Sequence, residues 1–103
     1  MKVRYHPDAR AELSAAAEWY EERRPMLGQD FQTEVRRAEA LIADRPTTWP
    51  RWPGVGVDVR RFRLTRFPYC LAFQVTGDNI AVIAVAHQSR APFYWRDRAK
   101  VVK

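Results

Sequence analysis

The spacing of apolar residues changes once along this chain, and this change constrains the fold more than any other feature. Two apolar stripes before residue 46 recur at helical spacing. The stripes are Ala9, Leu13, Ala16 and Tyr20, followed by Phe31, Val35, Ala38 and Ile42. From Val57 to Gln88 the period is two, which is typical of strands. Because both helical stripes precede the strand-like half, the sequence predicts an α+β fold.

Prolines set the bounds of the two predicted helices, 7–24 and about 29–44. Pro7 suits a first helical position, and Asp8 lies near the positive end of the helix dipole. Pro25 and Pro46 disfavour helical geometry in the residues before them. Because the turn at 26–28 is short, the two helices are expected to form an antiparallel hairpin.

Strands are predicted at 2–6 and at about 57–65, 69–76 and 80–88, with a hairpin turn at Thr76-Gly77-Asp78-Asn79. Residues 46–56 hold Trp49 and Trp52 among prolines and glycines, which indicates an ordered connector. The predicted order is βααβββ in a single domain, 1–103. It is a helical hairpin packed on a twisted antiparallel sheet, with a short helix at about 92–100 and a basic tail.

The positive charge is concentrated in the second part of the chain. Residues 1–45 carry 8 basic and 9 acidic groups, whereas residues 46–103 carry 10 basic and 3 acidic groups. Such a balance favours a polyanion or an acidic protein as partner. A solvated basic face is the alternative interpretation of the same counts.

Strand alternation predicts where three of these arginines lie. Arg60 is expected on the same face as Phe62 and Leu64, whereas Arg61 and Arg63 point to the opposite face. If the helices cover the Phe62 face, the other face stays open and exposes two arginines. Arg60, Arg61 and Arg63 are therefore candidates for binding a nucleic acid or another target.

The composition excludes several classes of site. Cys70 is the only cysteine, so the chain forms no internal disulfide, and with two histidines it offers no metal-ligand cluster. No cofactor is implied. The start of the chain has no apolar leader, and no apolar run approaches the roughly 18 residues of a membrane span. A cytoplasmic protein is expected.

The strongest candidate site follows the last predicted strand, where His87, Arg90 and Tyr94 come close together in the sequence. Histidine titrates near neutral pH, arginine is a permanent cation suited to phosphate, and tyrosine adds a phenol. Each residue also has a structural interpretation. His87 can bind a backbone carbonyl, Arg90 can pair with Asp97, and Tyr94 can pack on the sheet as Trp95 is expected to do.

The order of several motifs resembles the RelE/ParE superfamily of bacterial toxins from type II toxin-antitoxin systems, often described as plasmid stabilisation proteins. The likeness spans nearly the whole chain and agrees with the predicted fold. The motifs are Trp19-Tyr20-Glu21, Leu27-Gly28 with Phe31, Arg60-Arg61-Phe62, Phe67-Pro68-Tyr69, and Ala84-Val85-Ala86-His87 with Arg90, Pro92, Tyr94 and Trp95.

One branch of this superfamily, as the resemblance implies, cleaves mRNA in the ribosomal A site with the help of the 2′-hydroxyl. Arg61 and Arg63 then match its basic pair, Arg90 its phosphate-stabilising arginine and Tyr94 its tyrosine. Tyr94 or His87 would take the 2′-hydroxyl proton, while Arg61 and Arg90 would hold the developing charge. Cys70 departs from the pattern, because that branch has an arginine there.

The other branch, which the run His87-Gln88-Ser89 and the long hairpin resemble, poisons DNA gyrase by binding alone. The same arginines would then be contact residues. Either branch implies a cognate antitoxin that forms a hetero-oligomer with the toxin and masks Arg61, Arg63 and Arg90. Two alternatives remain, a non-toxic RNA-binding module and an inactivated toxin homologue. The chain lacks the strand order and glycine-rich basic motif of an RRM.

Overall fold

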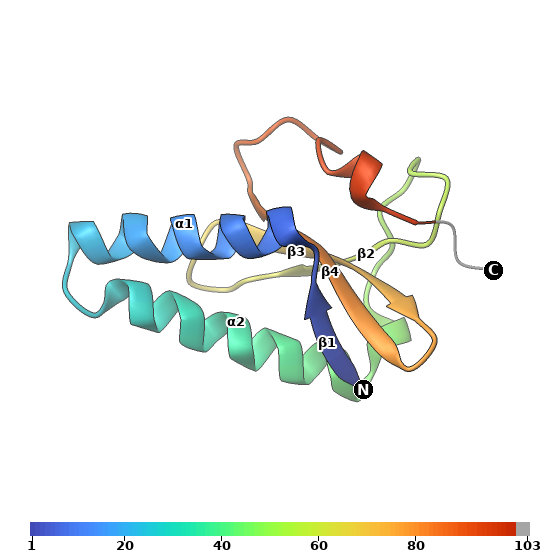
Figure 1. The fold of residues 1–103 in the computed structure, drawn as a ribbon, viewed down its shortest axis with the longest axis horizontal. Helices are drawn as coiled ribbons and strands as arrows, with labels where there is room; N and C mark the ends of the chain where they lie inside the picture. The colour runs from blue at the N-terminus through green and yellow to red at the C-terminus, as the bar shows by residue number, and fades with distance from the viewer. Residues whose placement is uncertain (101–103) are drawn as a thin grey trace.

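The helices and strands follow the order that the sequence predicts. The computed structural model describes residues 1–100. Its elements are β1 (Lys2–Tyr5), α1 (Pro7–Arg23), α2 (Leu27–Asp44), a 3-10 turn at Pro46–Thr48, β2 (Arg60–Arg63), β3 (Tyr69–Thr76), β4 (Asn79–His87) and a second 3-10 turn at Arg96–Arg98. Figure 1 shows the two helices side by side as a hairpin along the sheet. The α+β class is confirmed.

The sheet is mixed rather than wholly antiparallel. Its strand order is β1-β4-β3-β2. The predicted antiparallel pairing holds for β2, β3 and β4, but β1 lies parallel to β4, with Val3 opposite Ile80. The whole hairpin separates β1 from the other strands, so local turn residues do not specify how β1 pairs.

The turn between α1 and α2 is held by a side-chain cap from Glu21. Met26 takes a left-handed conformation with φ of 74° and ends the turn, after which α2 begins two residues earlier than predicted. The Glu21 carboxylate accepts hydrogen bonds from the backbone N–H groups of Met26 and Gly28, at 2.8 and 3.0 Å. Glu21 thus caps the exposed amides at the start of α2.

The sheet is covered on both faces. The helices pack on one face around Phe31, Val35, Ile42, Leu71 and Phe73, all of which are buried. A bulge between Ala72 and Phe73 leaves Ile83 as an extra residue of β4, so Ile83 and Ala84 both join a second core on the other face. The second core centres on Trp95, which is 1% exposed.

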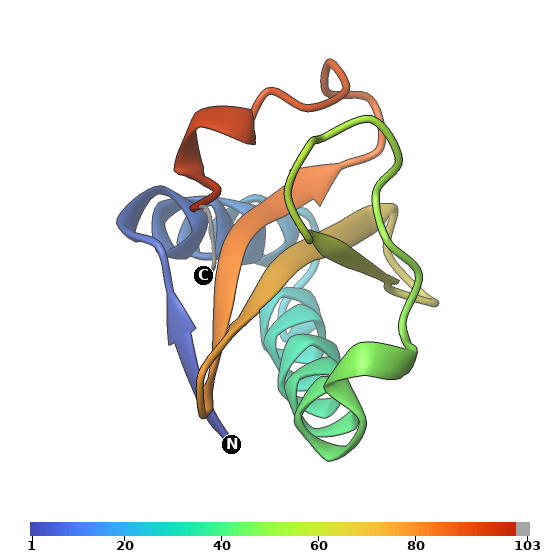
Figure 2. The same ribbon diagram turned by 90° about the vertical axis from the view of Figure 1, so that its right-hand side faces the viewer.

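The prediction of an open second face is therefore correct only in part. The connector and the segment after β4 lie side by side over it (Figure 2), and Trp52 of the connector stacks edge-on with Trp95 at 5.3 Å. The predicted helix at 92–100 is one 3-10 turn. The Gln74 side chain holds Lys100 at both its N–H and its C=O, at 2.9 and 2.7 Å. The predicted tail beyond residue 100 lies outside the described residues.

Within residues 1–100, no helix has the length and apolar character that a membrane crossing requires.

Gly28→Ala should destabilise the fold by about 1–3 kcal/mol, because a Cβ at this position would lie 2.3 Å from the Ala17 carbonyl oxygen. Urea unfolding measures the change. Gln29→Ala, at the exposed neighbouring position, is the control and should stay near wild type. Equal stability of Gly28→Ala and Gln29→Ala would contradict the close packing of the two helices.

Candidate functional site

Five of the predicted site residues line one pocket on the second face of the sheet. This arginine pocket, of about 280 Å³, lies between β2 and the segment after β4. Its predicted members are Arg61, Arg63, His87, Arg90 and Tyr94. The structure thus brings together residues up to 33 positions apart in the chain.

The strand register explains the meeting of β2 with the last segment. Arg61 pairs with Ala72, and Arg63 pairs with Cys70, which in turn pairs with Ala86 just before His87. Burial raises the pKa of the Cys70 thiol, while the charges of Arg63 and Arg61 oppose that rise. The neutral thiol occupies the position where the ribonuclease pattern has a cation.

Arg60, which was expected on the opposite face from Arg61 and Arg63 and named as a candidate binding residue, does not line the pocket. Its guanidinium is 11% exposed and donates to the carbonyl oxygens of Thr47 and Trp49, at 2.8 and 2.9 Å, and more weakly to Asp58. The connector leaves these carbonyls without a partner strand, and Arg60 satisfies them. Arg60 holds the connector in place.

The three pocket arginines carry uncompensated charge. Among residues 1–100, no carboxylate lies within ion-pair distance of Arg61, Arg63 or Arg90, so the predicted alternative of an Arg90–Asp97 pair is not found. The Arg90 guanidinium carbon lies 4.0 Å from the centre of the Tyr94 ring. That stacking positions Arg90 while leaving its N–H groups free for an anion.

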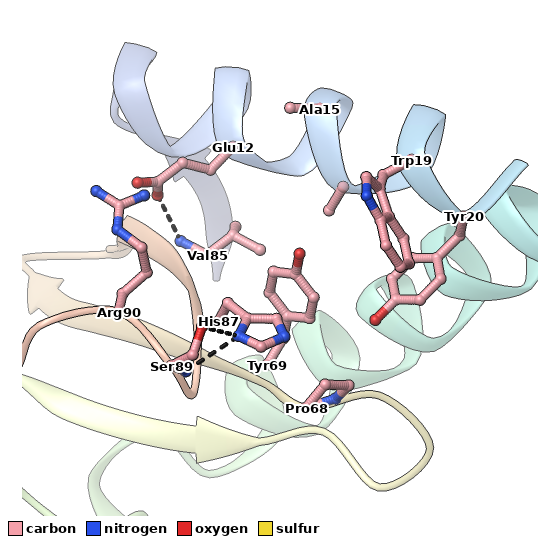
Figure 3. A pocket seen from close by; sticks show the side chains of 11 residues that line it. Glu12, Ala15, Trp19, Tyr20, Pro68, Tyr69, Val85, His87, Ser89 and Arg90 are labelled. Carbon is pink, nitrogen blue, oxygen red and sulfur yellow. Dashed lines mark hydrogen bonds between the residues drawn. The ribbon is translucent and has the colours of Figure 1, made fainter. Parts of the chain in front are cut away.

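His87 serves the turn that follows β4. Its Nδ1 accepts the Ser89 backbone N–H at 3.0 Å and lies 2.7 Å from the Ser89 hydroxyl (Figure 3). The Nδ1 lone pair of His87 is thus engaged by Ser89. The contact is with a backbone donor rather than the carbonyl that the structural interpretation expected.

The Tyr94 hydroxyl is committed to a carboxylate. It donates to Glu12 Oε2 at 2.8 Å. The pKa of Tyr94 lies well above its usual value because the phenol is buried and because Glu12 accepts its proton and repels the phenolate; Arg90 and Arg98 only partly oppose this. The phenol therefore stays protonated, which disfavours the predicted role of a base.

Glu12 is the functional residue that the sequence reasoning missed. Besides Tyr94, its carboxylate accepts the Val85 backbone N–H at 2.9 Å (Figure 3) and a two-pronged contact from Arg98 at 3.0 and 3.1 Å. Glu12 lies three residues after Ala9 and four before Ala16, so it shares their buried helix face. A carboxylate in an apolar helical stripe is the signal that could have revealed it.

Glu12 and Arg98 bond to the part of the β4 edge that has no strand partner. β1 pairs with β4 only as far as Val82, and beyond it the same edge of β4 is without a strand partner. There Glu12 accepts the Val85 N–H and Arg98 donates to the Ile83 carbonyl oxygen at 3.0 Å. The ion pair satisfies backbone groups that would otherwise be left unpaired in a partly buried place.

The comparisons with known proteins agree with this architecture. The family model described as the ParE toxin of type II toxin-antitoxin system, parDE, matches residues 3–92. Among solved structures, a chain of the chromosomal ParDE TA system from P. aeruginosa is similar, with a TM-score of 0.72 and 19% sequence identity. That match covers 84% of this chain and 95% of the other. Among curated proteins, none matches.

Glu12→Gln should lower the free energy of unfolding by about 2–3 kcal/mol, because it leaves the partly buried Arg98 with only the exposed Asp8 carboxylate at 3.8 Å. Urea unfolding provides the measurement. Glu18→Gln, at an exposed position of the same helix, is the matched control and should change stability by less than about 0.5 kcal/mol. A similar small loss for both variants would show that the ion pair contributes little.

The raised Tyr94 pKa predicts a loss of stability in alkali. The folded chain holds this proton more tightly than the unfolded chain, so the contribution is complete below the ordinary tyrosine pKa of about 10 and declines above it. Tyr94→Phe should therefore lose less stability than wild type between about pH 8 and about pH 10.5. Urea unfolding of both proteins at both pH values tests this prediction. The other tyrosines titrate in both proteins, so an equal fall in the free energy of unfolding would refute it.

Proposed function

Because the chain belongs to the ParE toxin family of type II toxin-antitoxin systems, we propose that it inhibits growth by binding its target through the arginine pocket, without cleaving RNA. The proposed target is DNA gyrase, which the gyrase-poisoning branch of the superfamily inhibits. Ribosome-dependent mRNA cleavage is the competing function, since the same arginines match the ribonuclease pattern.

The hydrogen bond from Tyr94 to Glu12 carries this proposal. RNA cleavage through the 2′-hydroxyl needs a group that accepts its proton. The Tyr94 phenol is bound to Glu12 with its pKa raised, and His87 Nδ1 is engaged by Ser89. Cys70 provides no cation for the phosphate. The pocket therefore offers charge for binding and no poised base.

Binding of a target, unlike cleavage of RNA, requires only the positive charges that the pocket supplies. Arg61, Arg63 and Arg90 come from two segments that the sheet and the Trp52–Trp95 contact hold in fixed positions. Guanidinium groups bind carboxylates and phosphates through paired hydrogen bonds, so an acidic protein surface or a DNA backbone fits this pocket. Either could be presented by a topoisomerase bound to DNA.

We propose that a cognate antitoxin neutralises the toxin by forming a hetero-oligomer with it in the cytoplasm. The structure of the P. aeruginosa relative belongs to a system that contains both components by its name. An acidic partner complements the uncompensated arginines. Half-exposed Trp19 and Met26 offer apolar surface to the same partner.

Tyr94→Phe separates the two functions. It keeps the ring on which Arg90 stacks and removes only the hydroxyl. We expect inhibition of gyrase supercoiling within about threefold of wild type, whereas Arg90→Ala should weaken it about 10- to 100-fold. Arg36→Ala, on the exposed surface of α2, removes the same charge elsewhere and should have no effect.

The same purified proteins are assayed for mRNA cleavage on translating ribosomes. Intact transcripts together with inhibited supercoiling support the binding function. Cut transcripts that disappear with Tyr94→Phe would show that the chain is a ribonuclease and that the phenol acts in catalysis.

A further inference from the structure

The interior of the arginine pocket is apolar, although its rim is cationic. Cys70, Ala86 and Trp95 line the pocket and are buried, so they form its base. Arg63 and Arg90 also line it but are exposed, which places them at its rim. The volume of about 280 Å³ is close to the lower limit of about 300 Å³ for small-ligand pockets. The pocket therefore has room for a ring-sized apolar group beside the cations.

Three aromatic rings at this interior give the pocket a fixed shape. Trp52, Phe93 and Trp95 contact one another edge-on, with ring centres 5.3 to 5.9 Å apart. Phe93 has a φ of 63°, a left-handed backbone conformation that residues with large side chains rarely adopt. Such conformations concentrate at binding sites, where the surrounding packing maintains them. The aromatic wall is therefore in place before a ligand arrives, so binding requires little ordering of side chains.

Two of the pocket cations are held on aromatic faces. The Arg61 guanidinium carbon lies 5.5 Å from the centre of the Trp52 ring, and that of Arg90 lies 4.0 Å from the centre of the Tyr94 ring. A guanidinium stacked on a ring keeps the N–H groups at its edge available for a phosphate. Arg63 adds a third cation, and in the described part of the chain none of the three has a carboxylate within ion-pair distance.

An unpaired nucleotide fits the pocket better than the alternatives do. A carboxylate side chain pairs with one guanidinium but leaves the apolar interior empty. The backbone of a DNA duplex reaches the rim only, because the bases of a duplex are stacked inside it. An unpaired nucleotide has a flat base that stacks on aromatic side chains and a phosphate that binds arginine. It therefore complements the interior and the rim together.

We propose that the arginine pocket binds one unpaired nucleotide, with its base in the aromatic interior and its phosphate on Arg61, Arg63 and Arg90. A free nucleotide and an unstacked nucleotide of a DNA strand share this chemistry. The inference rests on the proposed function, because it takes the pocket as the surface that contacts the target. A free nucleotide would compete with the target for the same arginines, whereas a strand would itself be part of the target.

Calorimetry on the wild-type protein at constant salt tests the proposal, since phosphate contacts depend on salt. Thymidine 5′-monophosphate should bind at least about tenfold more tightly than thymidine or inorganic phosphate. A short oligothymidylate should bind at least about tenfold more tightly alone than when paired with its complement. The proposal is overturned if neither the monophosphate is preferred to phosphate nor the single strand to the duplex, because the arginines would then bind anions alone.

The same two comparisons identify the source of the nucleotide. A preference for the monophosphate over phosphate, without a preference for the single strand over the duplex, identifies a free nucleotide. A preference for the single strand over the duplex identifies a DNA strand. Either result supports the proposal, and both are obtained with wild type, so the test does not depend on the folding of a variant.

Phe93→Gly tests the place of the base. Glycine adopts the φ of 63° without strain, so the variant removes the ring and preserves the backbone. Its affinity for the preferred ligand should fall about tenfold, while its affinity for inorganic phosphate stays within about twofold of wild type. Arg90→Ala should weaken both, and Arg36→Ala, on the exposed surface of α2, is the matched control and should weaken neither. Unchanged nucleotide affinity in Phe93→Gly would contradict a base in the aromatic interior.

Failure of this inference can be distinguished from failure of the proposed function. A wild-type protein that binds the nucleotide but neither slows growth nor inhibits gyrase would refute the proposed function alone. A protein that inhibits gyrase but shows neither of the two ligand preferences would refute this inference alone.

Discussion

The structure depends on one carboxylate that takes the place of a strand. Where β1 ends, Glu12 and Arg98 satisfy the backbone of β4 from the side, and the same carboxylate binds Tyr94. Helix α1, the sheet and the last segment thus meet at a single ion pair, whose two side chains are 16% and 15% exposed. Removing either side chain would weaken the pairing of the other and leave a backbone group of β4 without its partner, so substitutions at the two positions are expected to be coupled.

This ion pair also determines the state of Tyr94, which lines the arginine pocket. On the side of the arginine pocket it holds the Tyr94 ring as a platform for Arg90 and keeps the phenol protonated. Glu12 also lines a cavity of about 610 Å³ between α1 and the ends of β3 and β4, where its carboxylate is already bonded to Val85, Tyr94 and Arg98. The proposal that the chain acts by binding its target rests on this one arrangement of charges.

Local sequence patterns predicted most of the fold, but they could not predict contacts between residues that lie far apart in the sequence. Apolar periodicity and Pro25 located the hairpin, and alternation placed Arg61 and Arg63 on the second face. The parallel pairing of β1 with β4 and the Trp52–Trp95 contact that covers the second face both join residues that lie far apart in the sequence. The candidate residues Arg61, Arg63, His87, Arg90 and Tyr94 lie around one pocket, whereas Arg60 is bonded to carbonyl oxygens of the connector. The resemblance to the ribonuclease branch implied Tyr94 or His87 as a base, and no local sequence pattern indicates that Glu12, 82 residues away, binds the Tyr94 phenol.

The attachment of the last segment has a consequence for the order of folding. Trp95, Arg98 and Lys100 hold this segment through Trp52, Glu12 and Gln74, so each contact joins residues that lie far apart in the sequence. The hairpin and the β3–β4 turn are local and can form as the chain emerges. The arginine pocket lacks Arg90 and Tyr94 until residues 90–100 have packed against the rest of the fold. The arginine pocket is therefore expected to form later in folding than the helical hairpin, because it needs this segment docked on α1, the connector and the sheet.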